Sequence, residues 1–236
     1  MWSVPESTTD RVKWPESSAP PWPAGVRATL WWHRSTPGAR RIGAGTVGAT
    51  LPLTLAMMVE YLDSPVGPYR EILASPVLRA PGRGIGVLPR MSVPFIAVDS
   101  EASVHGGRVH WQLPKVLAVF VGEVNGAFTA VSDSWRVSTS ARPIGPRLPI
   151  TGALGFAQPD AGGAGLRCAS ARLRGHFRFA RVSVQAAGPS IGEWLVSGDH
   201  LGFVITDGRM ITGRAVLHSQ GLGSTSVKRL SASGRS

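Results

Sequence analysis

One lysine in the middle of the chain has an apolar setting. In the stretch 106–118, Lys115 is the only ionisable residue after His110, and it follows Trp111 and Pro114. Because a proline ends any preceding helix, we expect Lys115 at a helix end and a forced turn. Its neighbours then favour a desolvated amine, the form that attacks a carbonyl carbon. The alternative is a lysine whose stem lies on an apolar surface and whose head is in water.

A desolvated lysine predicts imine chemistry. A neutral amine condenses with a ketone, and the protonated imine accepts the electron pair of a neighbouring bond to carbon when that bond breaks. For this the pKa of the amine must fall by several units from about 10.4. Burial lowers the pKa of a lysine by up to ~3–5 units. The sequence therefore predicts that Lys115 is buried, uncharged and facing a cavity.

Three segments around this lysine match one family in order and spacing. Gly107-Arg108, Trp111 and Leu113-Pro114-Lys115 resemble a "GRE-x-W-x-x-PK" segment. Residues 64–71, which end in Pro68-Tyr69-Arg70-Glu71, are similar to a "GPY-x-E" segment, and residues 89–99 are similar to the strand that leads to the lysine helix. These segments belong to the acetoacetate decarboxylase superfamily, and the resemblance covers roughly residues 59–118.

The resemblance implies an α+β fold, mostly antiparallel, with a barrel- or cone-like sheet and a few helices, one of which delivers Lys115 into the interior. It implies a Schiff-base carbon–carbon lyase that acts on a small keto acid without a cofactor, in a homo-oligomer. The decarboxylase of the family has a second lysine where this chain has Val116. Relatives of the aldolase or dehydratase type keep a single lysine, so both reactions stay open.

The resemblance also suggests the other site residues. Glu71 matches a pocket acid that assists proton transfer, and Glu60 is the candidate for a second one. Tyr69, Trp111 and Arg27 are candidates for substrate binding, with Arg27 (or Arg34) in place of the family's pocket arginine. Glu71 has an alternative reading as an exposed strand residue that pairs with Arg70 or Arg108. The alternative function is a non-catalytic small-molecule binding protein on the same scaffold, in which Lys115 is merely structural.

Two glycine motifs point to other functions but lack the required context. Residues 43–48 form GxGxxG, with Asp63 downstream, yet a turn precedes them and Pro52 follows, so a Gly-rich turn is favoured over a dinucleotide site. Residues 188–192 form GxSxG, with His200 downstream as in an α/β-hydrolase. The sequence after Ser190 is strand-like rather than helical, which favours a turn serine over a nucleophile.

Composition narrows the class of protein further. The chain has 236 residues and a formal charge of +11, but no basic run or nucleic-acid motif, so we expect no nucleic-acid partner. Cys168 is the only cysteine, which excludes an internal disulfide and a cysteine-based metal site. His105 and His110 lack a third ligand nearby, so no metal is expected. No run of 18 apolar residues occurs, and we expect a cytoplasmic protein without membrane contact.

The succession of sequence patterns along the chain predicts its domain organisation. We expect an irregular arm over residues 1–24, one domain over residues 25–218 and a flexible basic tail over residues 219–236. Glycines 106 and 107 are expected to permit close packing or a turn at a helix capped by Asp99 or Ser100. Strands are predicted over these ranges: 27–33, 51–62, 69–73, 85–98, 117–121, 128–132, 135–139, 172–184, 194–196, 201–206 and 210–217. Residues 143–149 are expected to form a proline-rich connection.

Overall fold

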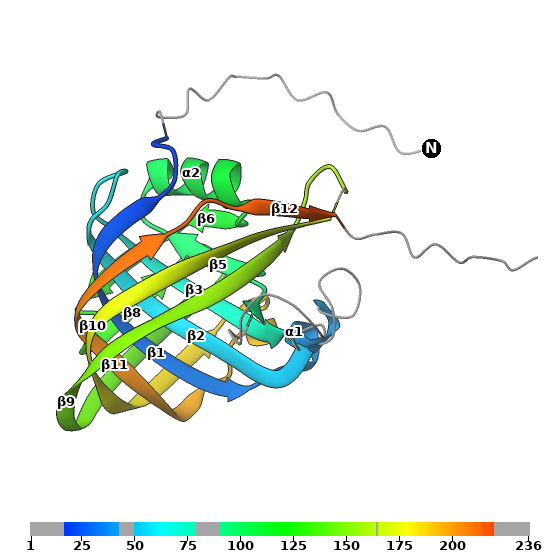
Figure 1. Ribbon diagram of the computed structural model, residues 1–236. Coiled ribbons are helices and arrows are strands. Elements are labelled where there is room, and N and C mark those ends of the chain that lie inside the picture. The colour runs from blue at the N-terminus through cyan, green and yellow to red at the C-terminus, as the bar shows by residue number, and fades with distance from the viewer. Residues whose placement is uncertain (1–16, 43–49, 79–89, 164, 220–236) are drawn as a thin grey trace, which may run out of the picture.

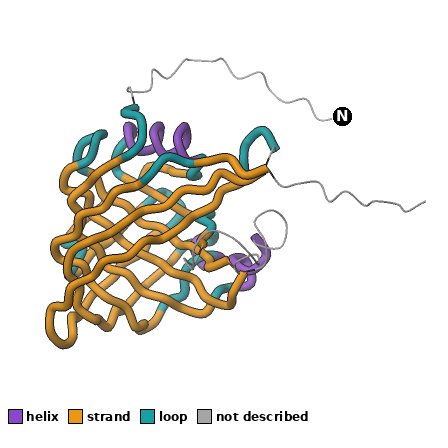
Figure 2. Tube along the Cα trace, viewed as in Figure 1, coloured by secondary structure: helices purple, strands orange, loops and turns teal. Residues whose placement is uncertain are grey.

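The computed structural model of the chain describes residues 17–42, 50–78, 90–163 and 165–219, and most of them lie in strands (Figures 1 and 2). The elements in chain order are β1 (Trp22–Arg34), α1 (Pro37–Ile42), β2 (Thr50–Asp63), β3 (Tyr69–Leu78), β4 (Arg90–Met91), β5 (Phe95–Val98), α2 (Glu101–Trp111), β6 (Lys115–Leu117), β7 (Val119–Gly122), β8 (Ala127–Val131), β9 (Arg136–Pro159), β10 (Gly165–Ala187), the 3₁₀ turn η2 (Ile191–Glu193), β11 (Gly198–Thr212) and β12 (Val216–Ser219).

All of these strands belong to one sheet that closes on itself. The order β10-β11-β1-β2-β3-β4-β9 is completed by a long antiparallel pairing of β9 with β10, which joins the two ends of the row. Most pairs are antiparallel; β4 with β9 and β5 with β6 are parallel. The predicted α+β class with a barrel- or cone-like sheet is therefore confirmed.

Period-two alternation gives β1, β2 and β3 two different faces. One face packs into a large core against side chains of the strands β8 to β11 of the same closed sheet. The fully buried members of this core include Trp31, Met58, Ile72, Phe128, Val137, Val182 and Val204. The other face carries Val26, Val59, Tyr61 and Tyr69. That second face encloses the interior space described below.

Several sequence predictions about single segments need correction. Residues 143–149 are not a connection: they lie inside β9, where their prolines and Gly145 interrupt the register between Phe177 and Phe179. Residues 194–196 are not a strand, since Trp194 closes the 3₁₀ turn η2. The predicted strand 85–98 is described only from residue 90, where it is broken into β4 and β5 by a segment around Pro94.

Other predictions lie outside the described residues. The first sixteen residues of the predicted arm, the GxGxxG segment 43–48 and nearly all of the predicted tail belong to these parts of the chain. Within the ranges that are described, no helix is long and apolar enough to cross a membrane. Those same ranges contain no cluster of three His, Cys, Asp or Glu side chains able to hold a metal ion.

Candidate active site

Helix α2 begins with a well-formed cap. Ser100 has extended backbone angles, and its Oγ accepts a hydrogen bond from the Ser103 N–H at 3.2 Å. Glu101 lies in the first turn, where a carboxylate is favoured by the helix dipole. Of the two predicted caps, Asp99 and Ser100, the structure shows Ser100. The helix packs against β5, β6 and β10 and lies across one end of the sheet (Figure 1).

The end of α2 reverses the chain toward the interior. Gln112 adopts a left-handed conformation with φ 55°, and its N–H donates to the Arg108 carbonyl oxygen at 3.0 Å. This bond from the left-handed residue to the carbonyl four residues earlier is the αL type of helix ending, and the Leu113 N–H donates in addition to the Gly107 carbonyl oxygen at 3.1 Å. Pro114 then prevents further helix, as expected. Lys115 is the first residue of β6, just beyond this turn, which agrees with the expected position after a helix end.

Gly107 and Arg108 hold Lys115 in place from α2. A Cβ at Gly107 would lie 2.6 Å from Lys115 Cδ and 2.8 Å from its Cε, so only glycine leaves room for the lysine stem. Arg108 donates to the Lys115 carbonyl oxygen through Nε at 3.0 Å and Nη2 at 2.7 Å. This explains the Gly-Arg pair of the sequence motif: one residue makes space for the side chain and the other fixes the backbone.

The lysine head forms a buried ion pair. Lys115 Nζ donates to Glu71 Oε2 at 2.7 Å and to Ser103 Oγ at 2.9 Å, and the Lys115 and Glu71 side chains are each 4% exposed. Tyr61 donates from its hydroxyl to the other oxygen, Glu71 Oε1, at 3.1 Å. Tyr69 stacks on Tyr61 at 4.2 Å between ring centroids, and its ring centroid lies 5.1 Å from Lys115 Nζ.

The electrostatics of this cluster differ from the sequence prediction. Burial by itself would lower the pKa of Lys115, but the Glu71 carboxylate and Tyr69 outweigh it and the pKa is raised above its usual value. Burial raises the pKa of Tyr69 to about 12. Burial and the Glu71 carboxylate raise the pKa of Tyr61 well above its ordinary value. Lys115 is therefore buried as expected, but it rests as a cation paired with Glu71 and not as a neutral amine.

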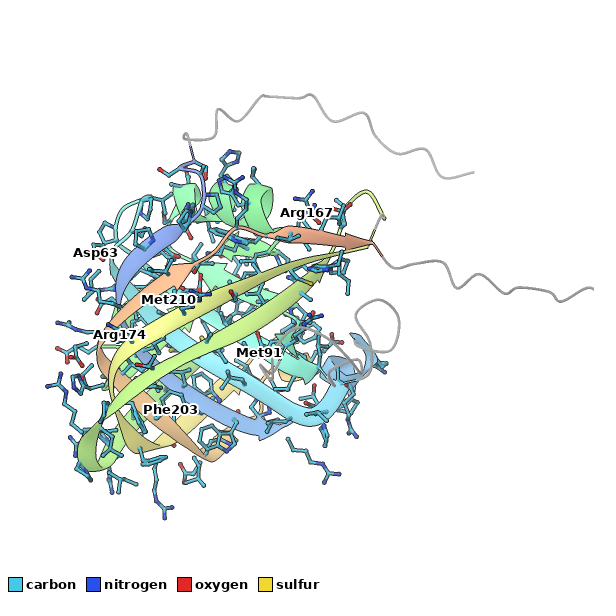
Figure 3. All side chains as sticks on the ribbon, in the orientation of Figure 1. Asp63, Met91, Arg167, Arg174, Phe203 and Met210 are labelled. Carbon is cyan, nitrogen blue, oxygen red and sulfur yellow. The ribbon has the colours of Figure 1, made fainter. Side chains whose placement is uncertain are left out.

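The pair lies on the wall of an apolar cavity of about 250 Å³ inside the ring of strands. Figure 3 labels three of its lining residues, Met91 on β4 and Phe203 and Met210 on β11. Its polar lining side chains are Tyr61, Tyr69, Glu71, Ser75, Lys115 and Thr212. Trp111 also lines it and is fixed by a hydrogen bond from Nε1 to the Gly213 carbonyl oxygen at 2.8 Å.

The structure brings Lys115, Glu71, Tyr69 and Trp111 together at this cavity but excludes the other two candidates. Glu60 lies on the opposite face of β2, where it pairs with Arg27 at 3.6 Å and Arg70 at 3.8 Å. Arg27 is 53% exposed in its side chain, and neither it nor Glu60 lines the cavity. Both assignments are wrong for the same reason. Side chains alternate between the two faces of a strand, and these two residues lie on the face that points away from the cavity.

Sequence reasoning missed Tyr61, Ser103 and Ser75. Tyr61 could have been found from the pairing of β2 with β3, in which it is directly opposite Tyr69. Ser103 reaches the lysine because it lies one turn before Gly107 on the same side of α2. The residue type of Ser75 carries no signal by itself; its place follows from alternation along β3 after Glu71 and Leu73.

The second glycine motif does not form a hydrolase site. Ser190 is exposed at the start of η2. His200 Nε2 is bonded to the Val196 carbonyl oxygen at 2.8 Å. Asp207, an acid downstream of the motif that such a triad would need, lies 2.9 Å from His176 Nδ1 and also accepts from Arg147. These partners leave Ser190 as a turn residue.

Comparison with known proteins agrees with the fold. No protein-family model matches the chain, and no curated protein does. Several solved structures, however, are similar to this chain in fold. The enduracididine biosynthesis enzyme MppR is similar with a TM-score of 0.59 and 16% identity, over 92% of this chain and 94% of that one. Acetoacetate decarboxylase from Legionella pneumophila is similar with a TM-score of 0.59 and 14% identity, over 85% of this chain and 88% of that one.

An acetoacetate decarboxylase-like enzyme from Sphingomonas wittichii gives a TM-score of 0.59 and 15% identity, over 84% of this chain and 93% of that one. These proteins define a class, the acetoacetate decarboxylase-like fold. This chain has that fold, and the resemblance noted in the sequence is thereby confirmed at the level of architecture.

Proposed function

We propose that this protein is a Schiff-base enzyme in which Lys115 forms an imine with a carbonyl substrate, and the bond between the carbon next to the imine carbon and the leaving carbon is then broken. One observation carries the proposal: the buried 2.7 Å pair of Lys115 Nζ and Glu71 Oε2 on the wall of an apolar cavity. A lysine that only stabilised the fold would have no need of a cavity at its head group.

The charged resting pair supplies the proton movements of imine formation. Glu71 takes one proton from Lys115, which frees the Nζ electron pair to attack the carbonyl carbon. The carbonyl oxygen then receives two protons in all from the former ammonium, in part through Glu71, and leaves as water. The products are a protonated imine, one water molecule and the Glu71 carboxylate, so charge and atoms balance.

The protonated imine is the electron acceptor for the next step. The electron pair of the breaking carbon–carbon bond flows toward the imine nitrogen and gives a neutral enamine, while the leaving carbon becomes carbon dioxide or a carbonyl group. In cleavage of the aldol type the Glu71 carboxylate takes the hydroxyl proton of the leaving carbon and returns it to the enamine carbon. In decarboxylation the Tyr61 hydroxyl, which is hydrogen-bonded to Glu71, gives that proton and regains one from water. Whether the reaction is decarboxylation or cleavage of the aldol type depends on the substrate, and the small keto acid suggested by sequence remains a prediction.

Reductive trapping tests the proposal. The protein is incubated with acetaldehyde, pyruvate or acetoacetate in the presence of cyanoborohydride and its intact mass is measured. The chain has three lysines, so Lys115→Ala is compared with Lys13→Ala and Lys228→Ala. We expect a mass increase that only Lys115→Ala removes. Labelling of Lys115 by no carbonyl compound, neither these three nor longer ketones such as nonan-2-one, would overturn the proposal and favour a binding protein.

A further inference from the structure

The far part of the cavity wall carries a hydroxyl without a partner. Ser75 lies on β3, on the same face as Glu71 and Leu73, and it lines the cavity. The residue is 0% exposed, and its Oγ has no hydrogen-bond partner within the part of the chain that the structure describes. Buried hydroxyl groups are nearly always hydrogen-bonded in folded proteins, so an unpartnered Oγ on a residue that lines the cavity is suited to a ligand atom.

Ser75 and Glu71 mark two separate ends of one cavity wall. Four residues of extended strand separate them, which corresponds to about 13 Å between their Cα atoms. Between them the wall is apolar: Leu73 lies on β3, and Ile96 lies beside it on β5. A ligand that reached both the Lys115 head and Ser75 would therefore be long and mainly hydrocarbon.

The cavity volume sets the size of such a ligand. A 150 Å³ cavity accommodates benzene, so about 250 Å³ corresponds to on the order of ten non-hydrogen atoms. Small keto acids such as pyruvate and acetoacetate have six or seven, and they would leave part of the space unfilled.

The side chains that line the cavity do not form a favourable binding site for an anion. Among the described residues that line the cavity, Lys115 is the only cationic one, and it is already paired with Glu71. Once Lys115 has become a protonated imine, the Glu71 carboxylate still balances its charge, so a ligand carboxylate farther along the cavity would face apolar side chains without a free cation to pair with. Burial of an unpaired carboxylate is strongly unfavourable.

We propose that the substrate is an uncharged, mainly apolar ketone or aldehyde of about ten non-hydrogen atoms. Its carbonyl carbon reacts with Lys115, and its other end carries a hydroxyl or carbonyl oxygen that hydrogen-bonds to Ser75 Oγ. This inference rests on the proposed function, since it names the substrate class of the same lysine.

Two isosteric probes and one charged probe test it. 8-Hydroxyoctan-2-one and nonan-2-one have the same number of non-hydrogen atoms and differ only in the terminal hydroxyl, and 7-oxooctanoate ends in a carboxylate. The concentration that gives half-maximal trapping with cyanoborohydride is measured for each probe, and for pyruvate and acetoacetate. We expect 8-hydroxyoctan-2-one to be about two- to tenfold better than nonan-2-one, the range of one hydrogen bond. 7-Oxooctanoate should be at least about tenfold worse than nonan-2-one.

Variants at Ser75 assign the difference to its hydroxyl. In Ser75→Ala the two isosteric ketones should become equal, whereas Ser75→Thr should keep the preference. Ser183→Ala, which removes an exposed serine from β10, is the matched control and should behave as the wild type.

The results separate this inference from the proposed function. Trapping of pyruvate or acetoacetate but not of either long ketone overturns the substrate class and leaves the Schiff-base proposal standing. Equal trapping of the two isosteric ketones by the wild type overturns the role of Ser75. Absence of trapping with every carbonyl compound overturns both proposals. The wild-type comparison alone decides the question if Ser75→Ala does not fold.

Discussion

Lys115 and Glu71 form their ion pair across an intervening strand. Glu71 on β3 pairs in register with Val98 on β5, and Lys115 on β6 pairs with Ile96 on the same strand. The lysine side chain therefore reaches diagonally over β5 to place Nζ 2.7 Å from Glu71 Oε2. Both charges are removed from water, so each depends on the other for compensation.

This mutual dependence predicts a strong coupling in stability. Lys115→Met or Glu71→Leu alone should lower the free energy of unfolding by about 3–5 kcal/mol, because each leaves a buried charged group without its partner. The double variant Lys115→Met/Glu71→Leu should lose far less than the sum, since apolar groups then replace the whole pair. Urea unfolding of the four proteins measures the coupling. Glu60→Gln, on the outer face of β2, is the control and should change the free energy by less than about 0.5 kcal/mol; additive losses would contradict the coupling.

The charged resting state predicts the pH dependence of imine trapping. Burial opposes protonation of Lys115, but Glu71 and Tyr69 together raise its pKa above the usual value. The initial rate of cyanoborohydride trapping should therefore still rise above pH 8, because the neutral amine becomes more abundant as pH increases. In Glu71→Gln the desolvation remains without the carboxylate, so the rise should move to lower pH. A wild-type rate that is constant from pH 7 upward would show that the amine is already neutral.

The same cluster predicts loss of stability in alkali. The pKa values of Lys115 and Tyr61 are raised and that of Tyr69 is raised to about 12, so the folded state keeps these protons to higher pH than the unfolded chain does. Stability from these groups is fully present below pH ~10, where both states are protonated, and declines as pH rises from about 10 toward 12. Urea midpoints measured between pH 8 and 11.5 should follow this decline. Tyr69→Phe should make the decline shallower, and an unchanged slope would exclude Tyr69 as a contributor.

The reactive lysine and its acid could be found from sequence because each lies in a continuous, distinctive segment. Lys115 is marked by Pro114 and its apolar neighbours, and Glu71 by the Gly-Pro-Tyr turn before it. The strand-rich pattern of the second half also indicated the class of fold. Long β9 could not be anticipated, since its prolines at 143, 146 and 149 are typical of a connection.

The second acid could not be chosen from sequence because the choice depends on strand register. Arg27, Glu60 and Arg70 pair in one row across β1, β2 and β3, on the face opposite to the cavity. A shift of one residue in a strand exchanges its two faces, and sequence does not fix that parity for an apolar run such as 51–62. Tyr61, one residue beyond Glu60, is the residue of β2 that contacts Glu71.

The close contact between α2 and Lys115 gives the final prediction. Gly107→Ala would place Cβ 2.6 Å from Lys115 Cδ, so the lysine stem must move and its head should leave the position 2.7 Å from Glu71. Both ionisable groups stay in the protein, yet trapping of carbonyl compounds should fall by tenfold or more, because misplacement by about 1 Å costs on the order of 100-fold in rate. Gly126→Ala is the matched control, since its Cβ would meet no atom closer than 3.7 Å. Intact-mass trapping and urea unfolding are measured together for both variants. If Gly107→Ala trapped carbonyl compounds at the wild-type rate, the position of the lysine head set by α2 would not matter for imine formation.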